Sequence, residues 1–255
     1  MSLIRQFKLM GILRVEAQSV WDDIDSVFRK RNNVDESQLV RAAGLTQDST
    51  FVSWLRASRS SILLVQGEFP PDSSTGITPL SVVGVECVMG LRTSELTVVL
   101  AFFGGLHCDE RRTDGPKAML RALIAQILLS DEIRTPSPDI MTAEDIEALQ
   151  SRDIRGLCEK FEQLISSLPL TPLTSLFCIL DGVGSYEQEP WRAELATVAE
   201  KFESLARKWN EDNRCFFKVL MLFPDRSLEV SQRIERDADI WSITSLRQDD
   251  DGERH

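Results

Sequence analysis

Lysine, histidine and tyrosine are scarce in this sequence, and their scarcity excludes several classes of function. There are seven lysines, two histidines and one tyrosine among the 255 residues. The formal net charge is −11 and the isoelectric point is close to 4.8. Nucleic acids and anionic lipid surfaces are bound by clustered Lys and Arg side chains. We therefore expect no nucleic-acid partner.

A long apolar run is also missing. The first thirteen residues are rich in Leu, Ile and Phe, but Arg5 and Lys8 interrupt them and no small-residue cleavage site follows. A membrane helix needs about 20 consecutive apolar residues, and a secretory signal has an apolar segment followed by a cleavage site. We expect neither a membrane span nor a secretory signal.

Cysteine occurs without any C-x-x-C pair. The five cysteines are widely spaced and mostly have apolar neighbours: Cys87, Cys108, Cys158, Cys178 and Cys215. An odd number in this arrangement indicates reduced thiols in an intracellular protein rather than a disulfide framework. We expect a cytoplasmic location.

Short apolar runs alternate with amphipathic segments over most of the chain. Five runs have the composition of buried strands, at residues 61–67, 95–103, 176–180, 215–223 and 240–246. The segments with helical periodicity lie at 14–31, 79–91, 116–128, 153–168 and 190–210, with shorter candidates at 32–44, after Thr142 and at 231–236. Strands separated by helices predict an α/β domain with a parallel sheet.

The predicted organisation has three parts. Residues 1–50 form an N-terminal helical extension, whose amphipathic segment 14–31 we expect to pack on its own domain. Residues 51–248 form the α/β domain, and residues 249–255 form an acidic tail. A loop rich in Pro, Ser and Gly joins the first strand to the helix that begins at Pro79.

The most informative stretch is Ser175 to Glu189. Its apolar run stops at Asp181-Gly182, and a carboxylate at the end of a buried strand can hold a metal ion or fix the following loop. Two interpretations of Asp181 stay open, a nucleotide or metal ligand and a structural carboxylate that caps its loop.

Other reactive residues have simpler explanations. His107-Cys108-Asp109-Glu110 lacks the further ligands of a zinc site, and Cys178 lies inside an apolar run, as a buried structural thiol would. Ser185 is not in the G-x-S-x-G motif of serine hydrolases. We expect no catalytic residue among them.

The order of these pieces resembles the signal-transduction P-loop NTPases, in particular the NACHT-like and nephrocystin-like N-terminal domains of fungal proteins. The matching pieces are Trp54-Leu55, 62–67, 98–107, 119–128, the Walker-B-like 176–182 and the sensor-like 218–226. The resemblance implies a three-layer P-loop NTPase-like fold. It also implies a nucleotide site at Gly67, Gly76, Thr78, Asp181 and Arg226, with Asp181 as the one metal ligand.

The sequence departs from the family's motifs at two points. The phosphate loop G-x-x-x-x-G-K-[ST] binds phosphates through backbone N–H groups and a Lys, but Gly67 and Gly76 lie nine apart and no Lys occurs between Lys30 and Lys117. Active relatives commonly have a second acid after the Walker B carboxylate, whereas Gly182 follows Asp181. Glu187 and Glu189 lie farther along the chain.

These losses predict a catalytically degenerate domain. Without the Lys and the second acid, little phosphoryl transfer is expected, and we expect no cofactor. The domain would act as an interaction, scaffold or regulatory module in intracellular signalling, with a protein partner or a second copy. The alternative is a divergent NTPase that binds ATP or GTP with Mg²⁺ through the 67–78 loop and Asp181. A third reading is a regulatory fragment of a longer signalling protein.

Overall fold

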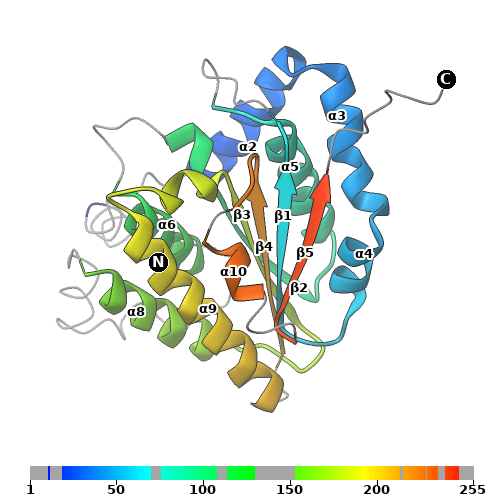
Figure 1. The fold of residues 1–255 in the computed structure, drawn as a ribbon. Coiled ribbons are helices and arrows are strands. Elements are labelled where there is room, and N and C mark those ends of the chain that lie inside the picture. The colour runs from blue at the N-terminus through cyan, green and yellow to red at the C-terminus, as the bar shows by residue number, and fades with distance from the viewer. Residues whose placement is uncertain are drawn as a thin grey trace.

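The structure is a computed structural model, and it describes residues 11, 19–69, 76–107, 114–129, 153–212, 215–227, 229–234 and 239–246. Five parallel strands form one sheet in the order β2-β3-β4-β1-β5 (Figure 1). The strands are β1 (Ser61–Gly67), β2 (Thr97–Phe103), β3 (Ser175–Asp181), β4 (Phe216–Phe223) and β5 (Trp241–Leu246). The predicted α/β class, with a parallel sheet between helices and a helical N-terminal part, is confirmed.

The described α-helices, in chain order, are α2 (Ser19–Lys30), α3 (Glu36–Ala43), α4 (Ser49–Arg56), α5 (Pro79–Leu91), α6 (Pro116–Leu129), α8 (Ile154–Ser167), α9 (Arg192–Asp212) and α10 (Ser231–Ile234). Short 3₁₀ helices occur at η1 (Arg31–Asn33), η2 (Gly44–Gln47), η3 (Gly104–His107) and η5 (Val183–Glu187). The expected short helix after Thr142 and the acidic tail lie outside the described residues.

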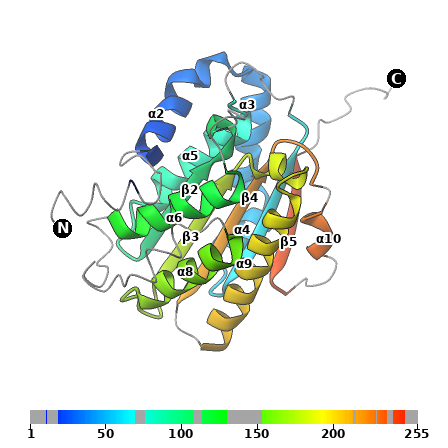
Figure 2. The same ribbon diagram turned by 90° about the vertical axis from the view of Figure 1, so that its left-hand side faces the viewer.

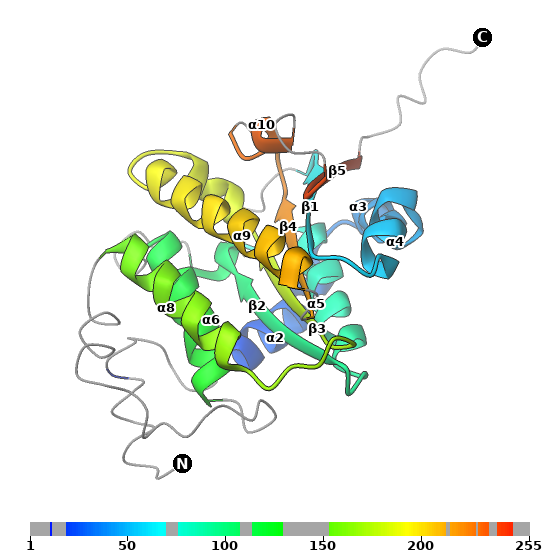
Figure 3. The same ribbon diagram turned by 90° about the horizontal axis from the view of Figure 1, so that it is seen from below.

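Helices cover both faces of the sheet, which explains why β1 to β4 are almost continuously apolar. Every residue of β1 is buried, as is usual in parallel sheets covered on two sides. One face carries α2, α3, α4 and α5, and the other carries α6, α8 and α9 (Figures 2 and 3). Two hydrophobic clusters, one on each face, form the core.

The direction of the chain reverses in the middle of the sheet. From β1 the chain crosses through α5 to β2 at the far edge, and it then returns through β3 and β4 to β5. The neighbouring strands β1 and β4 therefore continue to opposite faces, into α5 and α10 respectively (Figure 3). In open α/β sheets, ligands bind beyond the carboxyl ends of the strands at such a point.

The N-terminal helices pack on the sheet rather than standing apart from it. In α2, Ile24 and Val27 are buried in the cluster shared with α5, so the expectation that this helix packs on its own domain is confirmed. Helix α4 was not predicted, and it spans the expected boundary between residues 50 and 51. Within the described residues, no helix is long and apolar enough to cross a membrane.

Candidate functional site

Asp181 ends β3 and is 2% exposed. Burial raises its pKa to about 7, although hydrogen bonds from the Ser81 hydroxyl and the Gly182 backbone oppose the shift. Its second oxygen, Oδ1, has no hydrogen-bond partner among the described residues. A buried carboxylate in this state has a substantial neutral population near pH 7.

Thr78 caps the helix that meets Asp181. The Ser81 backbone N–H donates to the Thr78 hydroxyl over 3.2 Å, and the Thr78 N–H donates to the Ser81 hydroxyl over 3.0 Å. This reciprocal capping box is followed by Pro79 at the start of α5, where a missing N–H costs nothing. Thr78 is only 7% exposed, so its hydroxyl serves the helix start.

Three glycines bring the loops after β1, β2 and β3 into backbone contact. A Cβ on Gly76 would lie 2.1 Å from the Gly105 carbonyl oxygen, and a Cβ on Gly182 would lie 2.8 Å from the Gly105 nitrogen. Gly76 and Gly182 both have positive φ angles, which favour glycine. The backbone just before α5 is therefore packed against protein.

The chain places Ile77 where a phosphate loop has its lysine. Gly76-Ile77-Thr78 fits the last three positions of G-x-x-x-x-G-K-[ST], and Pro71 occupies the position of the first glycine. The Ile77 side chain is 1% exposed and packs in the cluster beneath α5. Sequence reasoning missed this alignment because it measured the spacing from Gly67, although the Gly-Ile-Thr triplet could have revealed it.

The segment after β1 is fixed to the segment after β4. Arg226 pairs with Glu68 over 2.9 Å, and the Phe69 N–H donates to the Pro224 carbonyl over 3.1 Å. The Phe69 ring is fully buried beneath the Arg41 guanidinium, 4.2 Å from its centroid, and it contacts the place where Gly67 would carry a Cβ. Arg226 therefore neutralises a neighbouring acid at the switch point.

A small cavity of about 120 Å³ lies at this end of the sheet, lined by Gln66, Gly67, Glu68, Arg226, Ser245 and Leu246. Neither Thr78 nor Asp181 lines it. The structure thus separates the predicted site residues into two groups. Gly67 and Arg226 meet at the cavity, whereas Gly76, Thr78 and Asp181 gather at the start of α5.

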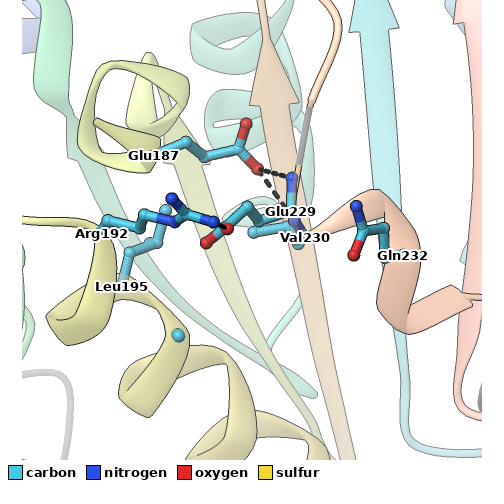
Figure 4. Close-up of a pocket in the computed structure, with 7 residues that line it drawn as sticks. Glu187, Arg192, Leu195, Glu229, Val230 and Gln232 are labelled. Atoms are coloured by element: carbon cyan, nitrogen blue, oxygen red, sulfur yellow. Dashed lines mark hydrogen bonds and ion pairs between the residues drawn. The ribbon is translucent and has the colours of Figure 1, made fainter. Parts of the chain in front are cut away.

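Glu187 has a structural role in this arrangement. Its Oε1 accepts a hydrogen bond from the Ser227 hydroxyl over 2.6 Å. The same oxygen accepts from the backbone N–H groups of Glu229 and Val230 over 3.1 and 2.9 Å (Figure 4). Arg192 pairs with Glu229 beside it, next to a cavity of about 150 Å³. Glu187 thus fastens the chain after β4, while Glu189 is exposed.

The side chains do not fit a magnesium nucleotide as a P-loop would hold it. A P-loop needs a Lys at the phosphates and a free Ser or Thr hydroxyl at Mg²⁺. Here the Lys position is an apolar core residue, and the Thr78 hydroxyl is engaged in a cap. Among the described residues, no group of three or more His, Cys, Asp or Glu side chains could hold a metal ion.

The reactive residues discounted from the sequence have local partners. His107 bonds to Asp23 of α2 over 2.9 Å and stacks on Phe102, so it joins the N-terminal helix to the end of β2. Cys178 is fully buried in β3, and burial raises its pKa. The four described cysteines are free thiols, and Cys108 lies outside the described residues.

The chain matches the model of a protein family described as nephrocystin 3, N-terminal, over residues 42–221. The match covers 180 of the 255 residues, from α3 into β4. The chain belongs to the nephrocystin 3 N-terminal family. No curated protein and no solved structure matches it. This nephrocystin-type domain carries α2, α10 and β5 outside the matched range.

Proposed function

We propose that this nephrocystin-type domain is a P-loop NTPase-like domain that has lost nucleotide hydrolysis and acts as an interaction, scaffold or regulatory module. The observation that carries the proposal is the closed arrangement of Thr78, Ser81 and Asp181 at the start of α5. Thr78 and Asp181 are 7% and 2% exposed, and Ser81 bonds to both. A nucleotide would have to break this arrangement to reach them.

The shortage of unpaired positive charge at the site supports the same proposal. Phosphoryl transfer depends on cations that stabilise charge on the transferred group. Ile77 replaces the lysine, and Arg226 is already paired with Glu68. Glu187, the nearest candidate for a second acid along the chain, is committed to the segment that follows β4.

The interaction role is supported by the surface. Large apolar side chains are exposed on several elements: Trp21, Phe28, Val40, Leu55, Met89, Leu96, Leu173 and Ile243. Leu96 and Leu173 are the most accessible of those at the amino ends of the strands, and the Ser175 N–H donates to the Leu96 carbonyl over 2.9 Å. A NACHT-like signalling role in the cytoplasm of a fungal cell is part of this proposal.

One observation favours the alternative of a divergent ATP- or GTP-binding protein. Asp181 Oδ1 is buried without a described partner at the start of a 13-residue helix, and a helix start attracts ligands of negative charge. If the Thr78–Ser81 cap opens, Asp181 and the helix start could take part in binding Mg²⁺ and phosphate. Arg226 would then have to leave Glu68.

Phosphate release tests the loss of hydrolysis. The purified chain is incubated with ATP or GTP and Mg²⁺, and the release of inorganic phosphate is compared with that of Asp181→Asn and of a sample without protein. We expect the same background rate in all three samples. A rate that exceeds the background in the wild type and disappears in Asp181→Asn would contradict the proposal.

A further inference from the structure

The two edge strands of the sheet, β2 and β5, differ in whether their outward backbone groups are already hydrogen-bonded. At the β2 edge, the Gln126 side chain of α6 accepts from the Ala101 N–H over 2.9 Å and donates to the Ala101 carbonyl over 2.8 Å. A side-chain amide therefore occupies the backbone positions that an added strand would use. Such blocking is one way in which proteins protect an edge strand from pairing with another chain.

The β5 edge has no comparable protection within the described part of the chain. The Ile62 N–H donates to the Ile240 carbonyl over 2.8 Å, and parallel pairing alternates along the strand. The backbone N–H and C=O groups of Ser242 and Thr244 consequently face β1. Those of Trp241, Ile243 and Ser245 point away from the sheet. No described residue bonds to these outward groups.

Strand β5 also lacks the residue types that usually protect an edge strand from pairing with another chain. Trp241 to Leu246 contains no charged residue, no proline and no glycine, and three of its six residues are the β-branched or aromatic types that favour strands. Ile243 is 37% exposed and Ser245 is exposed. Figure 3 shows β5 at the end of the sheet, with α10 on one side and α4 on the other.

We propose that β5 is a strand-addition edge and that its occupant is β5 of a second copy of this chain, paired antiparallel about Ile243. In that register all three outward residues bond, because Ile243 faces Ile243 of the second copy and Trp241 faces Ser245. If the twofold axis were shifted by one residue along β5, one of the three outward residues would have no hydrogen-bond partner in β5 of the second copy. On the other face, Ser242 lies opposite Thr244, and such hydroxyl pairs stabilise antiparallel strands.

Charge complementarity favours this orientation. Asp239 is exposed at the amino end of β5, and Arg226, whose side chain is 69% exposed, lines the cavity at the carboxyl end with Ser245 and Leu246. Antiparallel pairing brings Asp239 of each copy toward Arg226 of the other. The guanidinium of Arg226 bonds to Glu68 through Nη2 alone, and it has further N–H donors that a second carboxylate can use. A parallel arrangement would instead place Asp239 beside Asp239 in a chain of net charge −11.

The inference deepens the interaction role proposed above and rests on it, since it names one partner and one surface. Its test is independent of nucleotide. Sedimentation or light scattering over a concentration series should show the mass rise from 28.8 kDa toward twice that value. If the chain hydrolyses nucleotide and also dimerises, only the proposed loss of hydrolysis is wrong. If it does neither, only the proposed dimer is wrong.

Ile243→Pro is the decisive variant. Its outward N–H does not bond to β1, so proline removes the central inter-copy hydrogen bonds and spares the ladder within the sheet. We expect the dissociation constant of the dimer to rise by at least about tenfold, and the circular dichroism spectrum to stay unchanged. Ile243→Val is the matched control and should associate as the wild type does.

Two further variants keep the test decisive if Ile243→Pro folds poorly. Ser245→Lys places a charge opposite Trp241 of the second copy and should abolish association. Asp239→Lys should weaken it by roughly two- to tenfold, since each dimer loses two exposed ion pairs. A wild type that stays monomeric over the whole series would overturn the proposal, and so would a dimer that Ile243→Pro and Ser245→Lys leave intact.

Discussion

At the scale of single residues, burial sets the chemistry of Asp181. Its carboxyl lies between the end of β3 and the start of α5, and its pKa is raised to about 7 from an ordinary value near 3.8. The folded chain therefore holds a proton that the unfolded chain releases between about pH 4 and pH 7. In this window the folded state binds more protons, so its stability falls as the pH rises.

Asp181→Asn should remove this dependence of stability on pH. Asparagine cannot ionise, so the free energy of unfolding of the variant relative to the wild type should rise by roughly 1–3 kcal/mol between pH 5 and pH 8. Urea unfolding at the two pH values measures the difference. Asp225→Asn removes an exposed carboxylate after β4 and is the control, for which we expect less than about 0.5 kcal/mol. An equal response of the two variants would show that the Asp181 carboxyl is not held in its neutral form.

Lys218 is a second residue governed by burial. It is 1% exposed in β4, and its ammonium donates to the carbonyls of Trp54 and Leu55 over 2.6 and 2.9 Å. Burial, reinforced by repulsion from Arg59, lowers its pKa to about 8. A cation at the last turn of α4 interacts favourably with the helix dipole, so Lys218 fastens this helix to the sheet.

At the scale of elements, the loops at the carboxyl ends of β1, β2 and β3 meet through glycine. Gly105 has as little room as Gly76, since a Cβ there would lie 2.1 Å from the Gly76 carbonyl oxygen. The neighbour is backbone, which cannot move aside as a flexible side chain can. Any larger residue at position 105 must push the loop before α5 away from the end of β2.

Gly105→Ala should therefore destabilise the fold by about 2–4 kcal/mol. Gly90→Ala is the matched control, because no atom lies within 4 Å of the added Cβ near the end of α5, and it should stabilise by up to about 1 kcal/mol. Thermal unfolding of both variants gives the comparison. If Gly105→Ala melted with the wild type, the loops would not be packed as described.

The sequence predicted β1 to β4 well because each is an apolar run that is largely buried between two layers of helices. It also predicted β5, although Ile243 and Ser245 are exposed there. It missed α4, although Asp48 caps this helix and Phe51 and Trp54 lie on its buried side. The predicted start of the long helix, Pro190, lies two residues before Arg192, where α9 begins. Short helices and helix ends depend on tertiary contacts that periodicity does not register.

The candidate site could be predicted only in part. The end of an apolar run located Asp181, since a parallel strand must leave the core there. The partners of the other groups lie far away in the chain, 158 residues apart for Arg226 and Glu68 and 40 for Glu187 and Ser227. No local pattern encodes such pairs, so the engagement of Arg226 and Glu187 required the three-dimensional structure.

At the scale of the whole molecule, the chain is an α/β domain with a parallel sheet between helices, and the charged groups at the switch point of the sheet are engaged in contacts within the protein. The switch point between β1 and β4 holds a Glu68–Arg226 pair, and the start of α5 is closed by its own cap. One edge of the sheet is blocked by Gln126, and no described residue bonds to the other edge, at β5. These features are the basis on which we propose binding to protein rather than chemistry on a small molecule.

Calorimetric titration of the purified chain with ATP and GTP in the presence of Mg²⁺ tests this account most directly. We predict no saturable heat at nucleotide concentrations up to about 1 mM, which corresponds to a binding free energy weaker than about −4 kcal/mol. Saturable binding with a micromolar dissociation constant that is lost in Asp181→Ala would contradict the account. It would show instead that the Thr78–Ser81 cap opens to admit a nucleotide.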